Sequence, residues 1–136
     1  MIGEVGQVCN DLKAAFRWPE ANTDWRDPGQ NLVLLFAAVG PHRFRHRFLT
    51  LRPRALKDPK ALREAQSLLM DCGAAGYGLL AVVERLKGLK ACLEGMAAAE
   101  GRRIRDLMRP EIEHAVGWLE KNGLAIPDDA LRALRL

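Results

Sequence analysis

Apolar residues recur at every third or fourth position along almost the whole chain, whereas alternation with a period of two is almost absent. Spacings of three and four place apolar side chains on one face of an α-helix, so the pattern predicts helices throughout. In the first helix this face consists of Ile2, Val5, Cys9, Leu12 and Phe16. Trp18-Pro19 is expected to end that helix, because a residue that precedes proline disfavours the helical region.

Capping residues and prolines divide the next segments into shorter helices. Asp27-Pro28 has the order of an N-cap and a first helical residue, which predicts a short buried helix over the sequence NLVLLFAAV. Asp58-Pro59 repeats this order and is expected to start a further helix that ends at Gly73.

The longest periodic segment follows the turn GAAGYG. Gly73, Gly76 and Gly78 have no strand before them and no G-K-[ST] after them, so we expect them to let two helices meet closely rather than bind phosphate. Leu80 and Val83 widen the apolar face beyond a narrow heptad seam, which favours the central helix of the chain's own bundle over a coiled coil. A homodimer through other faces stays possible. The seam itself is Leu79, Val82, Leu86, Leu89, Leu93 and Met96.

The last third of the chain continues the helical pattern. Arg109-Pro110 is expected to end a short helix, and Asn122-Gly123 has the composition of a helix C-cap after the next one. The tail LAIPDDALRALRL adds one more short helix. These signals together predict an all-α, single-domain bundle of six or seven helices over residues 1–136.

Composition narrows the class of protein. No stretch approaches the ~20 apolar residues of a membrane span, and the first residues lack the features of a secretion signal. Cys9, Cys72 and Cys92 are odd in number, far apart and without a C-x-x-C pair, so we expect reduced, buried thiols. The sequence therefore predicts a cytoplasmic protein without a membrane partner.

Positive charge is concentrated in residues 41–66. This block has eight basic and two acidic side chains, a net charge of +6, whereas the whole chain has a net charge of only +4. Such a concentration is typical of a surface that binds nucleic acid or another polyanion. The predicted binding residues are Arg43, Arg45, Arg47, Arg52, Arg54, Lys57, Lys60 and Arg63.

The stretch Pro41–Pro53 fits a helix bounded by its two prolines better than a strand. A strand would bury His46 together with the phenylalanines, whereas a helix places Phe44, Phe48 and Leu51 on one stripe and arginines opposite it. We therefore expect the phenylalanines to anchor the helix in the core and not to stack on bases.

No motif points to an enzyme. His42 and His46 would share a helix face, but no third metal ligand is placed near them. Glu111 and His114 lie one turn apart, a spacing that is common on solvated helix faces. The sequence therefore predicts no catalytic residue, no metal site and no cofactor.

Two segments resemble known DNA-binding folds. The segment KDPKALREAQSLLMDCGAAGYGLLAVVERLKG (57–88) is similar to the opening helices of winged-helix domains in phage replisome-organiser proteins, where a helix, a G-x-x-G-Y-G turn and a second helix recur. RIRDLMRPEIEHAVGWLEKNGLAI (103–126) is similar to the helix-turn-helix of winged-helix regulators. The resemblance implies a winged-helix-like core that binds DNA, with the helix from Glu111 as the recognition helix.

Two features depart from that family pattern. Glu111 and Glu113 have the wrong charge for phosphate contacts, and Pro127 starts a helix where the wing should follow, so the core would lack its wing. A second group of arginines could contact the nucleic-acid backbone: Arg102, Arg103, Arg105 and Arg109.

The predicted function is that of a small non-enzymatic nucleic-acid-binding or regulatory protein, of phage or mobile-element type. The basic helical region 41–63 would be its binding surface. The alternative is a protein-interaction or assembly module whose basic helix docks on an acidic protein partner.

Overall fold

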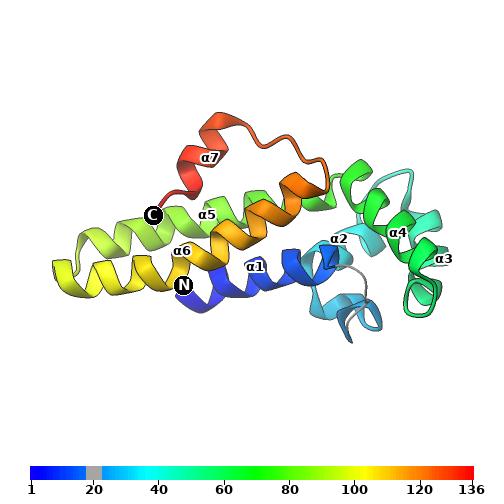
Figure 1. Cartoon of the computed structure of the whole chain (residues 1–136), viewed down its shortest axis with the longest axis horizontal. Helices are drawn as coiled ribbons and strands as arrows, with labels where there is room; N and C mark the ends of the chain where they lie inside the picture. Colours follow the sequence, from blue (N-terminus) through cyan, green and yellow to red (C-terminus); the bar gives the residue numbers. More distant parts are fainter. Residues whose placement is uncertain (18–22) are drawn as a thin grey trace.

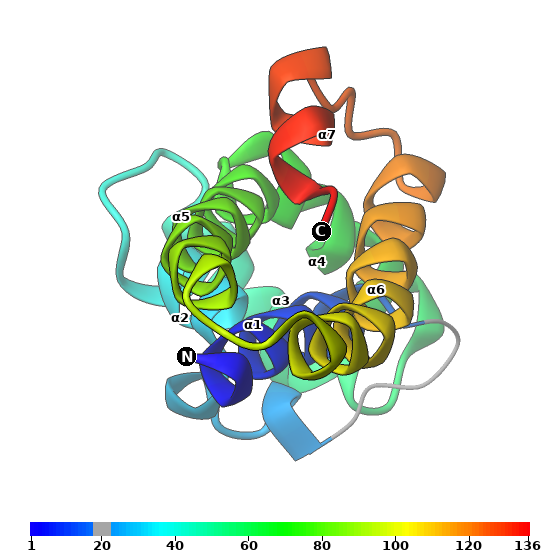
Figure 2. The same cartoon turned by 90° about the vertical axis from the view of Figure 1, so that its left-hand side faces the viewer.

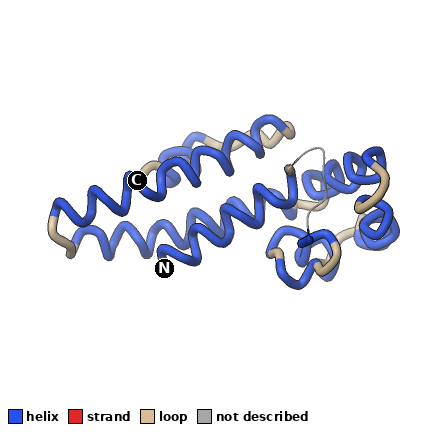
Figure 3. The backbone as a smooth tube through the Cα atoms, turned by 60° about the horizontal axis from the view of Figure 1, so that its bottom comes forward, coloured by secondary structure: helices blue, strands red, loops and turns tan. Residues whose placement is uncertain are grey.

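The computed structural model describes residues 1–17 and 23–136, and every regular element in this part of the chain is a helix (Figure 3). This confirms the predicted all-α fold. The predicted helix end at Trp18-Pro19 lies outside the described residues. Two short 3-10 helices, η1 (Thr23–Trp25) and η2 (Pro28–Gln30), precede the second α-helix. The α-helices are α1 (Ile2–Phe16), α2 (Leu32–Val39), α3 (Arg45–Ala55), α4 (Pro59–Asp71), α5 (Ala74–Glu94), α6 (Ala98–Lys121) and α7 (Asp128–Leu134).

The molecule is elongated along its two longest helices, α5 and α6, which run in opposite directions (Figure 1). Helix α1 packs against both, whereas α5 and α6 touch each other little. Seen along the long axis, α1 lies on one side of this pair and α7 on the other (Figure 2). Helices α2, α3 and α4 gather at one end of the molecule, and the turn between α5 and α6 forms the opposite end (Figure 1).

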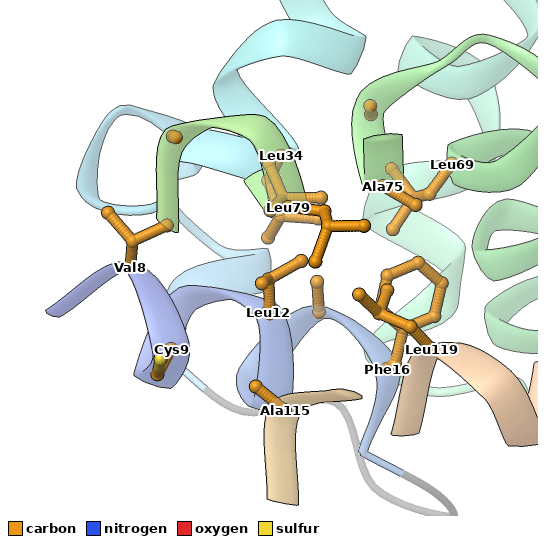
Figure 4. Packing of buried hydrophobic residues seen from close by; sticks show 14 of the residues in the cluster. Val8, Cys9, Leu12, Phe16, Leu34, Leu69, Ala75, Leu79, Ala115 and Leu119 are labelled. Carbon is orange, nitrogen blue, oxygen red and sulfur yellow. The ribbon is translucent and has the colours of Figure 1, made fainter. Parts of the chain in front are cut away.

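One hydrophobic cluster contains buried residues from all seven α-helices. In its centre, side chains of α1 such as Leu12 and Phe16 meet Leu79 of α5 and Leu119 of α6 (Figure 4). The predicted seam of α5 is buried within its own chain from Leu79 to Leu93, as expected for a central bundle helix. The last seam position, Met96, lies beyond α5 and is exposed.

Close contact between helices depends on one of the three predicted glycines. A Cβ atom at Gly78 would lie 2.8 Å from Leu12 Cδ2 and 2.9 Å from Val33 Cγ2, which is closer than carbon atoms can pack. At Gly76, in contrast, a Cβ atom would meet nothing within 4 Å. The close approach of α1 and α2 to α5 therefore requires glycine only at position 78.

A buried polar cluster joins α1, η1 and α2. The Asn31 side chain is fully buried; its oxygen accepts hydrogen bonds from the N–H groups of Val33 and Leu34 at 3.0 and 3.1 Å. Its Nδ2 donates to the backbone oxygen of Asp11 at 2.9 Å and to Asp24 at 3.0 Å. Asn31 is thus the N-cap of α2.

The prediction that Asp27 caps this buried helix is wrong. Asp27 does act as a cap, but for η2, where its carboxylate accepts a hydrogen bond from the N–H of Gly29 at 3.0 Å. Asp27-Pro28 does start a helical turn, but this turn is η2. Helix α2 begins four residues later, at Leu32, because Asn31 is held in place by hydrogen bonds to Asp11 of α1 and Asp24 of η1.

Two predicted helix ends are also wrong, because Pro53 and Pro110 lie inside α3 and α6. A proline inside a helix leaves the carbonyl four residues earlier without its N–H partner. Both prolines and both residues that carry these carbonyls are exposed, so water can take the place of the missing donor. Burial of Met108 and Ile112 on either side of Pro110 keeps α6 continuous. The turn expected near this proline is therefore absent.

The segment 57–88 is a helix, a turn and a helix, as its periodicity predicts. Asp58 caps α4 by accepting a hydrogen bond from the N–H of Lys60 at 2.9 Å, and Gly73 turns the chain with a φ of 85°.

No single helix in the described residues is long and apolar enough to cross a membrane. Helices α4 and α5 reach the required length and hydropathy only when they are taken together, and they are bent by 59° with respect to each other.

The three cysteines differ in environment, so the expectation that all are buried is wrong. Cys9 is fully buried, Cys72 half-buried and Cys92 exposed on α5. Burial raises the pKa of the Cys9 thiol to about 11, which keeps it protonated at neutral pH. Cys92 lies next to the buried Leu93 but on another face of α5, outside the predicted seam, so its exposure follows the helical periodicity.

An ion pair between Lys13 and Glu111 joins α1 to α6. The hydrogen bond and the charge of Lys13 hold the pKa of the Glu111 carboxyl below its ordinary value. Glu111 therefore stabilises the fold above its unfolded-state pKa of about 4.3, and this contribution is lost as the pH falls through the lower folded-state pKa.

We expect Glu111→Gln to lower the melting temperature at pH 7 and to have a shrinking effect as the pH is lowered toward about 3. Thermal unfolding followed by circular dichroism at several pH values measures this difference. A difference that stays constant with pH would show that the ionised form of Glu111 is not the stabilising one.

Candidate polyanion interface

The predicted basic residues lie on a helical hairpin, α3 and α4, at one end of the molecule (Figure 1). Helix α3 starts at Arg45 and not at Pro41, because residues 41–44 form a turn. Phe48 and Leu51 are buried beneath the hairpin, and Phe44 is half-buried. Phe48 and Leu51 therefore anchor the helix in the core as predicted, whereas Phe44 lies just before α3 and is only partly covered.

Two arginines on one face of α3 are paired with acids of α4 and its cap. Arg47 and Arg54 are seven residues apart and therefore share a helix face. Arg47 forms an ion pair with Glu64, and Arg54 lies 3.5 Å from the carboxylate of Asp58. Hydrogen bonds, first that from the N–H of Lys60, hold the pKa of Asp58 below its ordinary value. Part of the positive charge is thus balanced within the hairpin.

Arg52 has a structural partner instead of an acidic one. Its guanidinium Nη1 donates to the backbone oxygens of Trp25 at 3.1 Å and Arg26 at 2.7 Å. Its Nε is buried and has no hydrogen-bond partner in the described part of the chain. Arg52 therefore fixes α3 to η1, and most of its donors are not directed to solvent.

Four cations of the block form no ion pair with a carboxylate among residues 1–17 and 23–136, although the charge of Lys60 helps to lower the pKa of Asp58. Arg43 stacks on the ring of Phe44, with its guanidinium carbon 4.7 Å from the ring centre, and it stays exposed. Arg45 begins α3, Lys57 lies in the turn of the hairpin, and Lys60 lies in the first turn of α4; all three are exposed. Arg63 is exposed on α4 as well. We call Arg43, Arg45, Lys57 and Lys60 the basic end.

The structure separates the two predicted groups of basic residues. Arg102, Arg103 and Arg105 lie in the first turns of α6, at the end of the molecule opposite to α3 and α4 (Figure 1). Arg109 follows in the same helix, 4.0 Å from Asp106. A single short ligand site therefore cannot include both groups.

In the described part of the chain, His42 and His46 belong to no candidate metal site. His42 Nε2 lies 3.0 Å from the backbone oxygen of Ala37, and its ring stacks on Phe36. No group of three or more His, Cys, Asp or Glu side chains in the described residues could hold a metal ion.

The fold and this surface define a small all-α protein with eight basic side chains on and around the hairpin of α3 and α4. No protein-family model, no curated protein and no solved structure matches the chain. Its function is therefore inferred from its own charge and geometry.

Proposed function

We propose that this chain is a non-enzymatic nucleic-acid-binding protein and that the basic end contacts the phosphate backbone. The observation that carries the proposal is the position of the charge: the block of net charge +6 lies on the hairpin of α3 and α4 and the turn before it, while the rest of the chain has a net charge of −2. An origin in a phage or other mobile element belongs to the same proposal through the resemblance of 57–88, and a cytoplasmic site of action through the composition of the sequence.

Contacts through the basic end would be made mainly to phosphates. Arg43 and Arg45 lie at the start of α3, and Lys57 and Lys60 around the hairpin turn, so the four cations come from both helices of one rigid unit. Arginine and lysine at such positions bind phosphates of any sequence and fix the orientation of the protein on the nucleic acid. Binding is therefore expected to depend strongly on salt and weakly on base sequence.

Fluorescence anisotropy with a labelled random duplex of about 30 base pairs, and with the matching single strand, tests this at about 50 mM salt. Four phosphate contacts predict that the logarithm of the association constant falls against the logarithm of the salt concentration with a slope of about −3.6. Undetectable binding to both probes at low salt would overturn the proposal.

A second candidate is a protein-interaction module that docks on an acidic partner. The observation in its favour is Leu49, which is 40% exposed on α3 beside the arginines and would be buried by a protein surface. Binding to the duplex probe separates the two: a nucleic-acid-binding protein binds it at low salt, whereas a module that recognises only an acidic protein leaves it free. Both contacts weaken with salt, so salt dependence alone does not distinguish them.

A further inference from the structure

Helix α7 separates two apolar clefts of similar size. One cleft, of about 500 Å³, lies between α6 and α7, and we call it the α6 cleft. The other, of about 510 Å³, lies between α5 and α7 with its preceding loop, and we call it the α5 cleft. Within α7 only Leu134 is fully buried, so this short helix covers the space between α5 and α6 without filling it.

The volume of the α6 cleft lies in the range of small-molecule sites. Such sites typically have volumes of about 300–1,000 Å³ and mostly apolar walls. The α6 cleft fits that description, because its walls are Ile112, Val116, Leu131, Leu134 and Leu136.

The polar residues of the two clefts differ in charge. The α6 cleft carries two arginines, Arg109 and Arg135, against one acid, Glu113. Arg109 lies 4.0 Å from Asp106 and one helical turn from Glu113, and Arg135 has no ion-pair partner in the described residues. The α6 cleft is therefore apolar inside and cationic at its edge.

The α5 cleft has the opposite balance. Its lysine, Lys87, is paired with Glu84 at 2.6 Å, and Asp129 adds a second acid. Its apolar walls resemble those of the α6 cleft and include Leu79, Leu80 and Val83 of α5. An anionic group is thus favoured at one cleft and disfavoured at the other, although the volumes are nearly equal.

We propose that the α6 cleft binds an anionic amphiphile of the fatty-acid class. Its hydrocarbon chain would lie against Ile112, Val116 and Leu131, and its anionic head group would bind Arg109 and Arg135. Arginine recognises carboxylate and phosphate oxygens equally well by paired hydrogen bonds, so a free fatty acid and a lipid phosphate share this chemistry. This site is independent of the basic end, because none of its residues lies in α3 or α4.

Titration with 11-(dansylamino)undecanoic acid tests the site by the increase in dansyl fluorescence, followed by displacement with dodecanoate. We expect saturable binding, and a loss of about tenfold or more in affinity for the variant Arg109→Glu/Arg135→Glu, because its head-group contacts are removed. The matched control is Arg102→Glu/Arg103→Glu, which changes the net charge equally outside the cleft and should alter affinity by less than about twofold. Dodecanol, which lacks the charge, should displace the probe at least about tenfold less well than dodecanoate.

Three results would overturn the proposal. The first is the absence of saturable binding by the wild-type chain, and the second is an equal loss in both double variants. The third is a chain that co-sediments with phosphatidylglycerol vesicles although dodecanoate does not displace the dansyl probe. This result would indicate contact with a lipid surface and not a site for an acyl chain. Displacement by dodecanoate, with or without vesicle binding, supports the cleft and assigns its ligand to free fatty acids.

Discussion

Asn31→Ala is expected to lower the free energy of unfolding by about 3 kcal/mol, since it removes a helix cap and leaves buried polar groups without partners. The Asn31 side chain makes four hydrogen bonds, two with N–H groups of α2 and two that reach Asp11 and Asp24. Without it, the N–H groups of Val33 and Leu34 lose their acceptor in a region that excludes water. Urea unfolding followed by circular dichroism measures the change.

Asp27→Ala is the matched control for this prediction. It also removes a capping carboxylate, but its hydrogen bond to Gly29 is exposed, so we expect a loss of less than about 1 kcal/mol. Equal effects of the two substitutions would contradict the assignment of Asn31 as the structural junction of α1, η1 and α2.

Reversing three charges of the basic end is expected to have the largest effect on binding. The variant Arg45→Glu/Lys57→Glu/Lys60→Glu should bind the duplex probe at least about a hundredfold more weakly, because phosphate contacts are lost and repulsion takes their place. All three side chains are exposed and form no ion pair in the described residues, so the fold should be retained. Anisotropy titration gives the affinity, and circular dichroism confirms the fold.

Arg102→Glu/Arg103→Glu is the control for charge reversal away from the hairpin, and it should weaken binding by no more than about threefold. A loss as large as that of the triple variant would place the contact on α6 or show that net charge alone determines binding. Arg47 and Arg52 are not suitable for this test, because the first is paired with Glu64 and the second holds η1.

Local signals predicted most elements of the fold correctly. Asp58 caps α4, Gly73 has a positive φ at the next turn, and Gly123 with a φ of 91° ends α6 as its place after Asn122 predicts. These features depend on a few neighbouring residues, which is why a single sequence is sufficient to find them.

Errors arose where distant contacts outweigh local preference. Pro110 is a strong local signal for a helix end, but apolar residues on both sides of it pack against the common core and keep α6 continuous. Asn31 is the cap of α2 because its amide meets Asp11, twenty residues earlier in the chain. Neither the packing around Pro110 nor the hydrogen bond from Asn31 to Asp11 can be predicted from the spacing of residues in the sequence.

The candidate interface was predicted as a block of charge but not in detail. Composition locates the basic residues, yet it does not show that Arg47 pairs with Glu64, seventeen residues away, or that Arg52 binds backbone oxygens near Trp25. Side chains choose partners in space, so the unpaired cations become known only in the folded chain. The α6 cleft had no sequence signal at all, because its walls are apolar residues typical of any helix pair.

The most direct test of the central claim is an NMR titration of the ¹⁵N-labelled chain with unlabelled duplex DNA at low salt. We predict that the amide signals that shift belong to residues 43–63, around Arg43, Arg45, Lys57 and Lys60, while those of 102–109 stay unchanged. Shifts confined to 102–109, or no shifts at saturating DNA, would contradict the assignment of the basic end as the nucleic-acid-binding surface.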